Sequence, residues 1–157
     1  MSATTPKPAA ATPLYESDYY TWAREQARAL RERRLEQLDW ENLAEEVDDL
    51  AGRHADALEG HCEALIEHLL KLVYASEPVR CDNLRLWRAT IRNCRRKIRT
   101  VLERNPGVQA RTGELFSEAW PIGRNEALGK LNLDDDAIPQ TQAWSFDQAM
   151  DEEFEPR

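Results

Sequence analysis

The chain has 157 residues, of which 41% are hydrophobic and 32% charged, with only six glycines and a formal net charge of −8. This length allows one domain with a substantial core, and the scarcity of glycine argues against a turn-rich β fold. A chain this acidic is also a poor non-specific ligand for nucleic acids and other polyanions.

The first thirteen residues are rich in alanine, threonine and proline. They lack the apolar core of a signal peptide, and no run in the chain approaches the roughly 18 apolar residues of a membrane span. An odd number of cysteines without a secretory segment indicates reduced thiols. We therefore expect a flexible tail over residues 1–13, a single domain over residues 14–157, a cytoplasmic location and no membrane association.

The first predicted helix follows this tail. Tyr19, Trp22 and Leu30 recur at helical spacing. Ser17 or Asp18 can serve as the N-cap, because the side-chain oxygens of both residue types accept hydrogen bonds from the first turn of a helix.

A long second helix is predicted over residues 40–75. Asp39 can cap it, and the apolar positions from Leu43 to Leu72 stay in phase at about 100° per residue. The phase continues through Gly52 and Gly60, although each glycine costs a helix roughly 1 kcal/mol relative to alanine. We therefore favour one continuous helix over two short ones.

The rest of the chain is also predicted to be helical, with more interruptions. Pro78 breaks the pattern, and Asp82 can cap a third helix that ends at the sequence NPG. Pro121 should kink or split the next helix. Ser145 and Gln148 have the spacing of a capping box, which predicts a short last helix.

Together these elements predict an all-α fold, a helical bundle built on a long antiparallel hairpin of the second and third helices, with irregular C-terminal helices. A second helix near 50 Å exceeds a compact domain of this size, whose radius of gyration should be about 15 Å, so we expect a second copy to cover part of it. The expected core positions are Trp22, Leu43, Val47, Leu50, Leu58, Leu65, Leu69, Leu72, Trp87, Ile91 and Ile98.

The three histidines of the chain, His54, His61 and His68, lie seven residues apart on the apolar side of the second helix. Side chains of one helix converge on a metal ion only at spacings of three or four residues, so no two of these histidines can share an ion unaided. We interpret them as core or interface residues and predict no metal and no cofactor. The alternatives are a metal or catalytic role for one or more of them, with ligands from another helix or a second subunit, and a pH-sensitive interface, because imidazole titrates near pH 6.5.

A basic stripe stands out in the third helix, because residues 80–104 hold nine basic and only two acidic residues. Guanidinium groups in a row can track phosphates, or they can pair with the acidic second helix. We favour pairing within or between subunits and keep polyanion binding as the alternative. The arginines of the stripe are Arg85, Arg88, Arg92, Arg95, Arg96 and Arg99.

Several segments resemble one protein family: LYESDYYTW, LDWENLAEEVDDL, HLLK, WRATIRNCRRKIRTVLERNP and FDQAMDEEFEP. They cover nearly everything after the tail, and they resemble domain-of-unknown-function family 29, small bacterial proteins widespread in cyanobacteria and proteobacteria. The resemblance implies a purely α-helical fold and no established activity. Leu86 stands where the family usually has serine. The family pattern draws attention to Tyr19, Trp22, Glu45, Glu46, His68, Lys71, Trp87, Arg88, Ile91 and Arg95.

For function, we favour a non-enzymatic interaction or assembly module that forms a homodimer or larger assembly or binds an unidentified protein partner. Apolar helix faces edged with charge motivate this hypothesis, and the chain has no phosphate-binding loop or nucleophile elbow. Nucleic-acid or other polyanion binding through residues 85–99 is the first alternative. The second is an enzyme or metal site in which His68 acts with Glu46 and Arg88.

Overall fold

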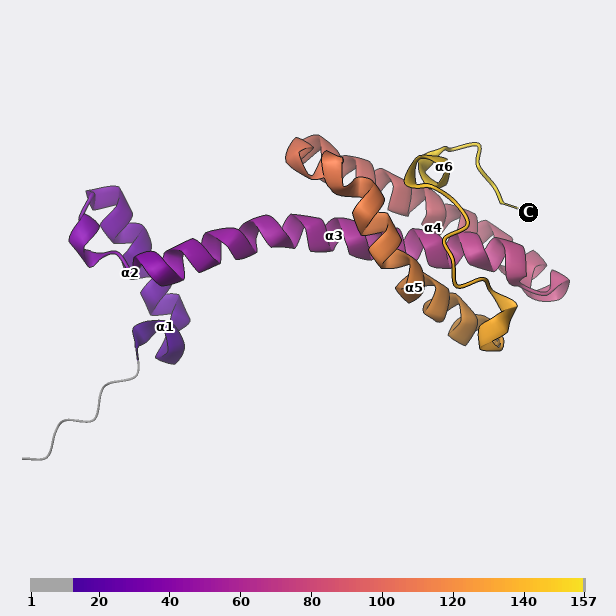
Figure 1. The fold of residues 1–157 in the computed structure, drawn as a ribbon, viewed down its shortest axis with the longest axis horizontal. Helices are drawn as coiled ribbons and strands as arrows, with labels where there is room; N and C mark the ends of the chain where they lie inside the picture. The colour runs from indigo at the N-terminus through magenta and orange to yellow at the C-terminus, as the bar shows by residue number, and fades with distance from the viewer. Residues whose placement is uncertain (1–12, 157) are drawn as a thin grey trace, which may run out of the picture. The chain divides into compact units, whose positions relative to one another are not determined.

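The computed structural model describes residues 13–156, and its helices are shown in Figure 1. Within these residues the chain forms six α-helices and three short 3-10 helices, and no strand. This confirms the predicted all-α class. The elements are α1 (Leu14–Ser17), α2 (Tyr19–Glu32), η1 (Leu35–Gln37), α3 (Trp40–Tyr74), α4 (Glu77–Arg104), η2 (Pro106–Arg111), α5 (Thr112–Leu131), η3 (Asp135–Ala137) and α6 (Phe146–Met150).

The chain divides into two compact units, residues 1–50 and residues 51–157. The expectation of a single domain from residue 14 onward stays a prediction. The expected tail lies, apart from Pro13, outside the described residues. None of the helices in residues 13–156 combines the length and the apolarity needed to cross a membrane.

The first unit contains α1, α2, η1 and the first turns of α3. Asp18 caps α2 as predicted, since its carboxylate accepts a hydrogen bond from the backbone N–H of Thr21 at 3.0 Å. α2 ends where Arg33 adopts a left-handed conformation with φ of 56°. The chain then turns back, and the backbone N–H of Arg34 donates to the carbonyl oxygen of Ala29.

α3 is one continuous helix of 35 residues that passes through Gly52 and Gly60. The prediction of a single long helix is therefore confirmed. A Cβ atom at either glycine would meet nothing within 4 Å, so neither glycine is required by close packing at that position.

The second unit is built on an antiparallel hairpin of α3 and α4, which are separated by only two residues. The ammonium group of Lys71, late in α3, lies 5.8 Å from the ring centroid of Trp87, early in α4. Cys62, earlier in α3, lies close enough to Cys94, later in α4, for Cys94 to raise the pKa of the Cys62 thiol. Residues late in α3 therefore face residues early in α4, and residues earlier in α3 face residues later in α4, as in an antiparallel pair. The predicted hairpin is confirmed.

α5, the orange helix in Figure 1, packs against α3, and buried residues of both helices belong to one hydrophobic core. A Cβ atom at Gly123 would lie 2.7 Å from the carbonyl oxygen of Glu63 and 2.9 Å from the side chain of Ile66. Glycine is therefore needed at residue 123, where the two helix backbones approach closely.

Two predicted helix boundaries are wrong. α4 begins at Glu77, with Pro78 in its first turn, and not at Asp82. Proline is well tolerated in a first turn, because the N–H that it lacks has no partner inside the helix. α5 runs unbroken from residue 112 to 131 with Pro121 inside it, so of the kink or split expected at Pro121, the split is absent.

The last helix, α6, is capped as predicted. The Ser145 hydroxyl accepts from the backbone N–H of Gln148, and the Gln148 side chain accepts from the backbone N–H of Ser145.

The core predicted from periodicity is confirmed in the second unit and wrong in part of the first. Leu58, Leu65 and Leu69 are fully buried, and Trp22 is also buried. Val47 and Leu50, which were expected in the core, are 64% and 55% exposed. Leu43 is half-buried.

Candidate functional site

A cluster of aromatic residues and one carboxylate joins α1 and α2 to α3 within the first unit. The hydroxyl of Tyr15 donates to Oε1 of Glu46 at 2.9 Å, and the hydroxyl of Tyr19 donates to Oε2 at 2.6 Å. The hydrogen bond to Glu46 raises the pKa of Tyr15 to about 12. The Tyr15 hydroxyl therefore keeps its proton, and both tyrosines hold the Glu46 carboxylate in place.

A second set of contacts fixes α2 at the start of α3. The indole N–H of Trp22 donates to Oδ2 of Asp39 at 3.1 Å, and the backbone N–H of Asp39 donates to Oε1 of Gln26 at 2.8 Å. Asp39 caps α3 as predicted, because it accepts from the backbone and side-chain amide of Asn42, and these bonds hold its pKa below the usual range. α2 is thereby held on one side of the first turns of α3.

An apolar groove lies between the end of α2 and the first turns of α3. Its volume is about 430 Å³. Four large apolar side chains in and beside it remain exposed: Leu30 at 49%, Trp40 at 59%, Val47 at 64% and Leu50 at 55%. The residues that line the groove are Leu30, Trp40, Leu43, Ala44, Val47 and Asp48.

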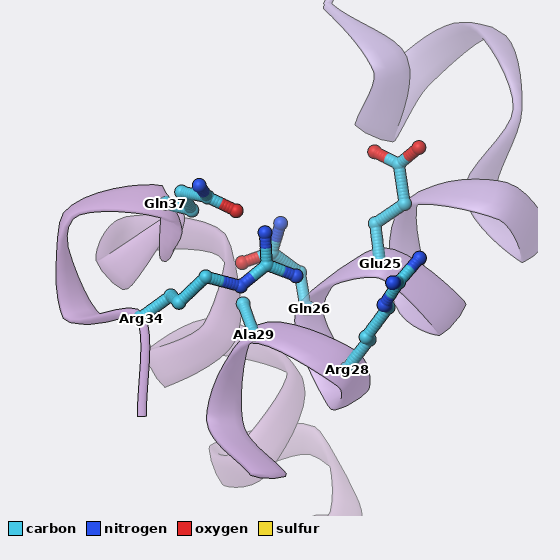
Figure 2. A pocket seen from close by; sticks show the side chains of 6 residues that line it. All are labelled: Glu25, Gln26, Arg28, Ala29, Arg34 and Gln37. Carbon is cyan, nitrogen blue, oxygen red and sulfur yellow. The ribbon is translucent and has the colours of Figure 1, made fainter. Parts of the chain in front are cut away.

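A polar pocket of about 280 Å³ lies between α2 and η1 (Figure 2). Figure 2 shows Arg34 reaching toward Gln26 and Ala29, with Glu25 and Arg28 on the side away from Gln37. Arg28 and Arg34 both pair with Glu32, at 2.8 and 2.6 Å. Two arginine charges are therefore balanced by Glu32 and Glu25, and the pocket favours neither anions nor cations.

The arginine stripe of α4 does not pair with the acidic side of α3 in the way that the sequence suggested. Arg95 is 4% exposed, and its three nitrogens donate to the carbonyl oxygens of Ala149, Glu152 and Phe154 at 2.8, 3.4 and 3.0 Å. Arg95 is thus directed toward the C-terminal segment of the chain.

Two further arginines bind carboxylates of that segment. Nε and Nη2 of Arg88 donate to the two oxygens of Glu155 at 2.6 and 2.7 Å, and Arg99 pairs with Glu152 at 2.8 Å. The remaining arginines of the stripe, Arg85, Arg92 and Arg96, are exposed. Polyanion binding through residues 85–99 stays a prediction that no contact in the structure tests.

The three histidines differ in their surroundings. His54 is exposed and His61 is half-buried, while His68 has 15% of its side chain exposed. The expectation that all three face the core is therefore wrong for His54. Burial lowers the pKa of His61 and of His68. Nδ1 of His68 donates to the carbonyl oxygen of Ala64 at 2.8 Å, which leaves Nε2 as the acceptor of the neutral ring.

Beside His68 lies a buried ion cluster of Glu67, Lys71 and Lys130. Glu67 and Lys71 are each 6% exposed and paired with each other, and Lys130 of α5 donates to Glu67 at 2.9 Å. Burial raises the pKa of Glu67, but hydrogen bonds from Lys71 and Lys130 outweigh it and leave the pKa below its usual value. The spacing of four residues between Glu67 and Lys71 could have predicted their ion pair. The contact with Lys130 of α5 could not be predicted from the sequence.

The residues proposed for an enzyme site are divided between the two units. Glu46 binds Tyr15 and Tyr19 in the first unit, whereas His68 and Arg88 belong to the second. Across residues 13–156 no three histidine, cysteine, aspartate or glutamate side chains gather closely enough to hold a metal ion.

Comparison with known proteins gives the family of the chain. Neither a curated protein nor a solved structure matches it. The family model described as Domain of unknown function DUF29 matches residues 14–155, which is nearly the whole chain. The protein therefore belongs to the DUF29 family.

Proposed function

We propose that this protein is a non-enzymatic assembly module, and that the apolar groove of its first unit docks onto a second copy of the chain. The observation that carries this proposal is the exposure of Leu30, Trp40, Val47 and Leu50 around one groove. Contiguous exposed apolar surface on a folded unit is typical of a site of association.

The exposed apolar residues are unevenly distributed. Among the described residues, eight large apolar or aromatic side chains of the first unit are exposed, against three in the much longer second unit. The eight are Leu14, Tyr19, Tyr20, Leu30, Leu35, Trp40, Val47 and Leu50, and the three are Val79, Leu86 and Ile122. The concentration in the shorter unit supports an interface there.

The arrangement of charge favours a second copy over a basic partner. At about 100° per residue, Trp40, Ala44 and Val47 lie on one side of α3, and the centre of its acidic residues lies roughly 120° away. Two copies can thus face each other across the apolar side with most of their acidic residues turned away and Asp48 at the edge of the groove, as a two-fold symmetric contact allows. The small side chain of Ala44 lets a second helix approach closely. The acidic residues are Glu41, Glu45, Asp48 and Asp49.

The test is the mass in solution, by size-exclusion chromatography with light scattering over a range of concentrations. We expect the wild type to have twice the 18.1 kDa mass of one chain. Val47→Glu should give the mass of one chain, because it places a charge in the interface. Leu86→Glu is the matched control, since Leu86 is 63% exposed on α4 and should leave the dimer intact.

Tryptophan fluorescence supplies a second reading. Trp40 is 59% exposed, whereas Trp22, Trp87 and Trp120 are buried. Dilution of the wild type should therefore shift the emission to longer wavelength as Trp40 enters water, and Val47→Glu should show the shifted spectrum at every concentration. A wild type of one-chain mass at about 100 μM, or a dimer that Val47→Glu leaves unchanged, would contradict the proposal.

The three unpaired thiols, Cys62, Cys81 and Cys94, support a reducing compartment such as a bacterial cytosol as the place where the module acts.

A further inference from the structure

The C-terminal segment from Ala149 to Pro156 lies on α4 in the manner of a bound peptide. After α6 it has no regular secondary structure, and in Figure 1 it is the yellow trace beside α4. Its backbone carbonyl oxygens at Ala149, Glu152 and Phe154 are all bound by Arg95, which is itself 4% exposed. A single buried guanidinium thus recognises the main chain of the segment, independent of its side chains.

The side chains of the segment are recognised at three further points. Arg88 binds the Glu155 carboxylate through two nearly equal hydrogen bonds, and Arg99 binds Glu152. Between these carboxylates Phe154 turns inward, where its ring meets Trp144 edge-on at 5.8 Å. α4 therefore recognises two carboxylates three positions apart, and Trp144 meets the aromatic residue between them.

The contacts that hold the segment are easily replaced. The side chains of Glu152 and Glu155 are 72% and 48% exposed, and ion pairs exposed to this degree add little to stability. Phe154 is only half-buried. Two hollows, of about 390 and 80 Å³, adjoin the segment and share Arg88 and Glu155 in their linings. Ala149 is fully buried, and beyond it only Met150 and Phe154 pack partly against the core, so the end of the segment opens at a lower cost in free energy than its start.

We propose that this surface of α4 is a recognition site for an extended acidic peptide with an aromatic anchor, and that residues 149–156 are its resident ligand within the same chain. When the resident segment opens, the same surface accepts an acidic segment of matching pattern from another protein molecule. The site belongs to the second unit and does not rest on the groove of the first.

The chemistry favours a peptide over a nucleic acid. Three donors of Arg95 are aimed at three backbone carbonyl oxygens of one segment, which a peptide offers and a phosphate backbone does not. Arg92 lines the smaller hollow together with Glu152 and Glu155, so one further guanidinium is available for a more acidic ligand. The internal ligand acts as a competitor at high effective concentration, and external ligands bind weakly until it is weakened.

The experiment uses the full chain and a fluorescein-labelled peptide with the sequence of residues 149–156, followed by fluorescence anisotropy. In the protein, Phe154→Ala with Glu155→Gln weakens the internal segment and leaves α4 unchanged. We expect this double variant to bind the peptide at least about tenfold more tightly than the wild type does. Adding Arg88→Ala to it should abolish the gain, because the two-pronged carboxylate contact is lost.

Matched controls separate recognition from charge. Glu153→Gln removes one negative charge from the same segment at a residue whose side chain is exposed, and it should leave peptide affinity at the wild-type level. A peptide of the same composition in scrambled order should bind the double variant at least tenfold more weakly.

Three results would overturn the proposal, provided that circular dichroism shows the double variant to be folded. These are peptide affinity equal to that of the wild type, equal affinity for the scrambled peptide, and binding of a single-stranded oligonucleotide in place of the peptide. The last would assign the arginine stripe to polyanions.

Discussion

The two parts of α3 have the same sequence pattern and different surroundings. In both, apolar residues recur at helical spacing opposite a row of acidic ones. In the second unit Leu58, Leu65 and Leu69 are fully buried, whereas Val47 and Leu50 of the first unit are more than half exposed. Even the acidic side differs, since Glu45 is exposed and Glu67 is buried between two lysines.

The difference shows what a periodic pattern can establish. It identifies the side of a helix that avoids water, and it leaves open whether another helix of the same chain covers that side. Where α4 and α5 supply the cover, the pattern describes a core. Where the side stays exposed, as at Val47, the same pattern describes a surface available for association.

The largest expected effect on stability distinguishes the acidic residues of the first part of α3 from those of the second part. Glu67→Gln should lower the free energy of unfolding by about 3–5 kcal/mol at pH 7, because it leaves the buried ammonium of Lys71 without its partner. Glu45→Gln, at an exposed position, should change it by no more than about 0.5 kcal/mol. Urea denaturation of both variants at one low protein concentration measures the two costs.

The stabilising contribution of the Glu67–Lys71 pair should depend on pH, and the direction of that dependence can be measured. The folded pKa of Glu67 is below its unfolded value of about 4.3, so its contribution is complete above that value and lost as the pH falls through the folded pKa. The gap between wild type and Glu67→Gln should therefore close in acid. A constant gap down to about pH 3 would show that folding does not lower the pKa of Glu67.

The second prediction compares the two apolar sides. Leu65→Ala should cost about 2–5 kcal/mol, because it leaves a cavity in the core of the second unit. Leu50→Ala should cost far less at a concentration where the protein is a monomer, since Leu50 already meets water. Equal costs for the two variants would mean that the first unit buries Leu50 and would remove the contrast between the two parts of α3.

The continuous α3, the cap at Asp18 and the capping box at Ser145 were all predictable, because each depends on residues within a few positions of one another. The start of α4 was missed for a local reason: Pro78 was taken as a break, although its place in a first turn suits it. Pro121 was likewise expected to divide a helix that tertiary packing holds together.

What the sequence could not supply was contact between distant segments. Arg95 looked like one more surface arginine, and its burial depends on a segment more than fifty residues later. Glu67 looked solvated because its second partner, Lys130, is on α5. Spacing along one helix contains no information about either contact. The residues of the candidate peptide site could therefore be identified only from the structure.

A third prediction uses the close approach of α5 to the second part of α3. Gly123→Ala should destabilise the protein by about 1–3 kcal/mol, because the new methyl group would lie 2.7 Å from the backbone oxygen of Glu63, which cannot move without displacing α3. The midpoint of thermal unfolding reports the loss. An unchanged midpoint would mean that the two helices are farther apart than the structure places them.

The smallest expected effect has the opposite sign and concerns Gly52, next to the boundary between the two units. A Cβ atom there would meet nothing within 4 Å, and the residue is helical. Gly52→Ala should therefore stabilise the protein by up to about 1 kcal/mol, because alanine loses less backbone entropy than glycine when it becomes helical. The measurement is the free energy of unfolding together with the helical signal in circular dichroism. If α3 is continuous in solution, the substitution raises the free energy of unfolding and leaves the helical signal nearly unchanged. A large gain in helical signal would show instead that the wild-type helix is frayed at Gly52, and a loss of stability would show that another segment packs against this position.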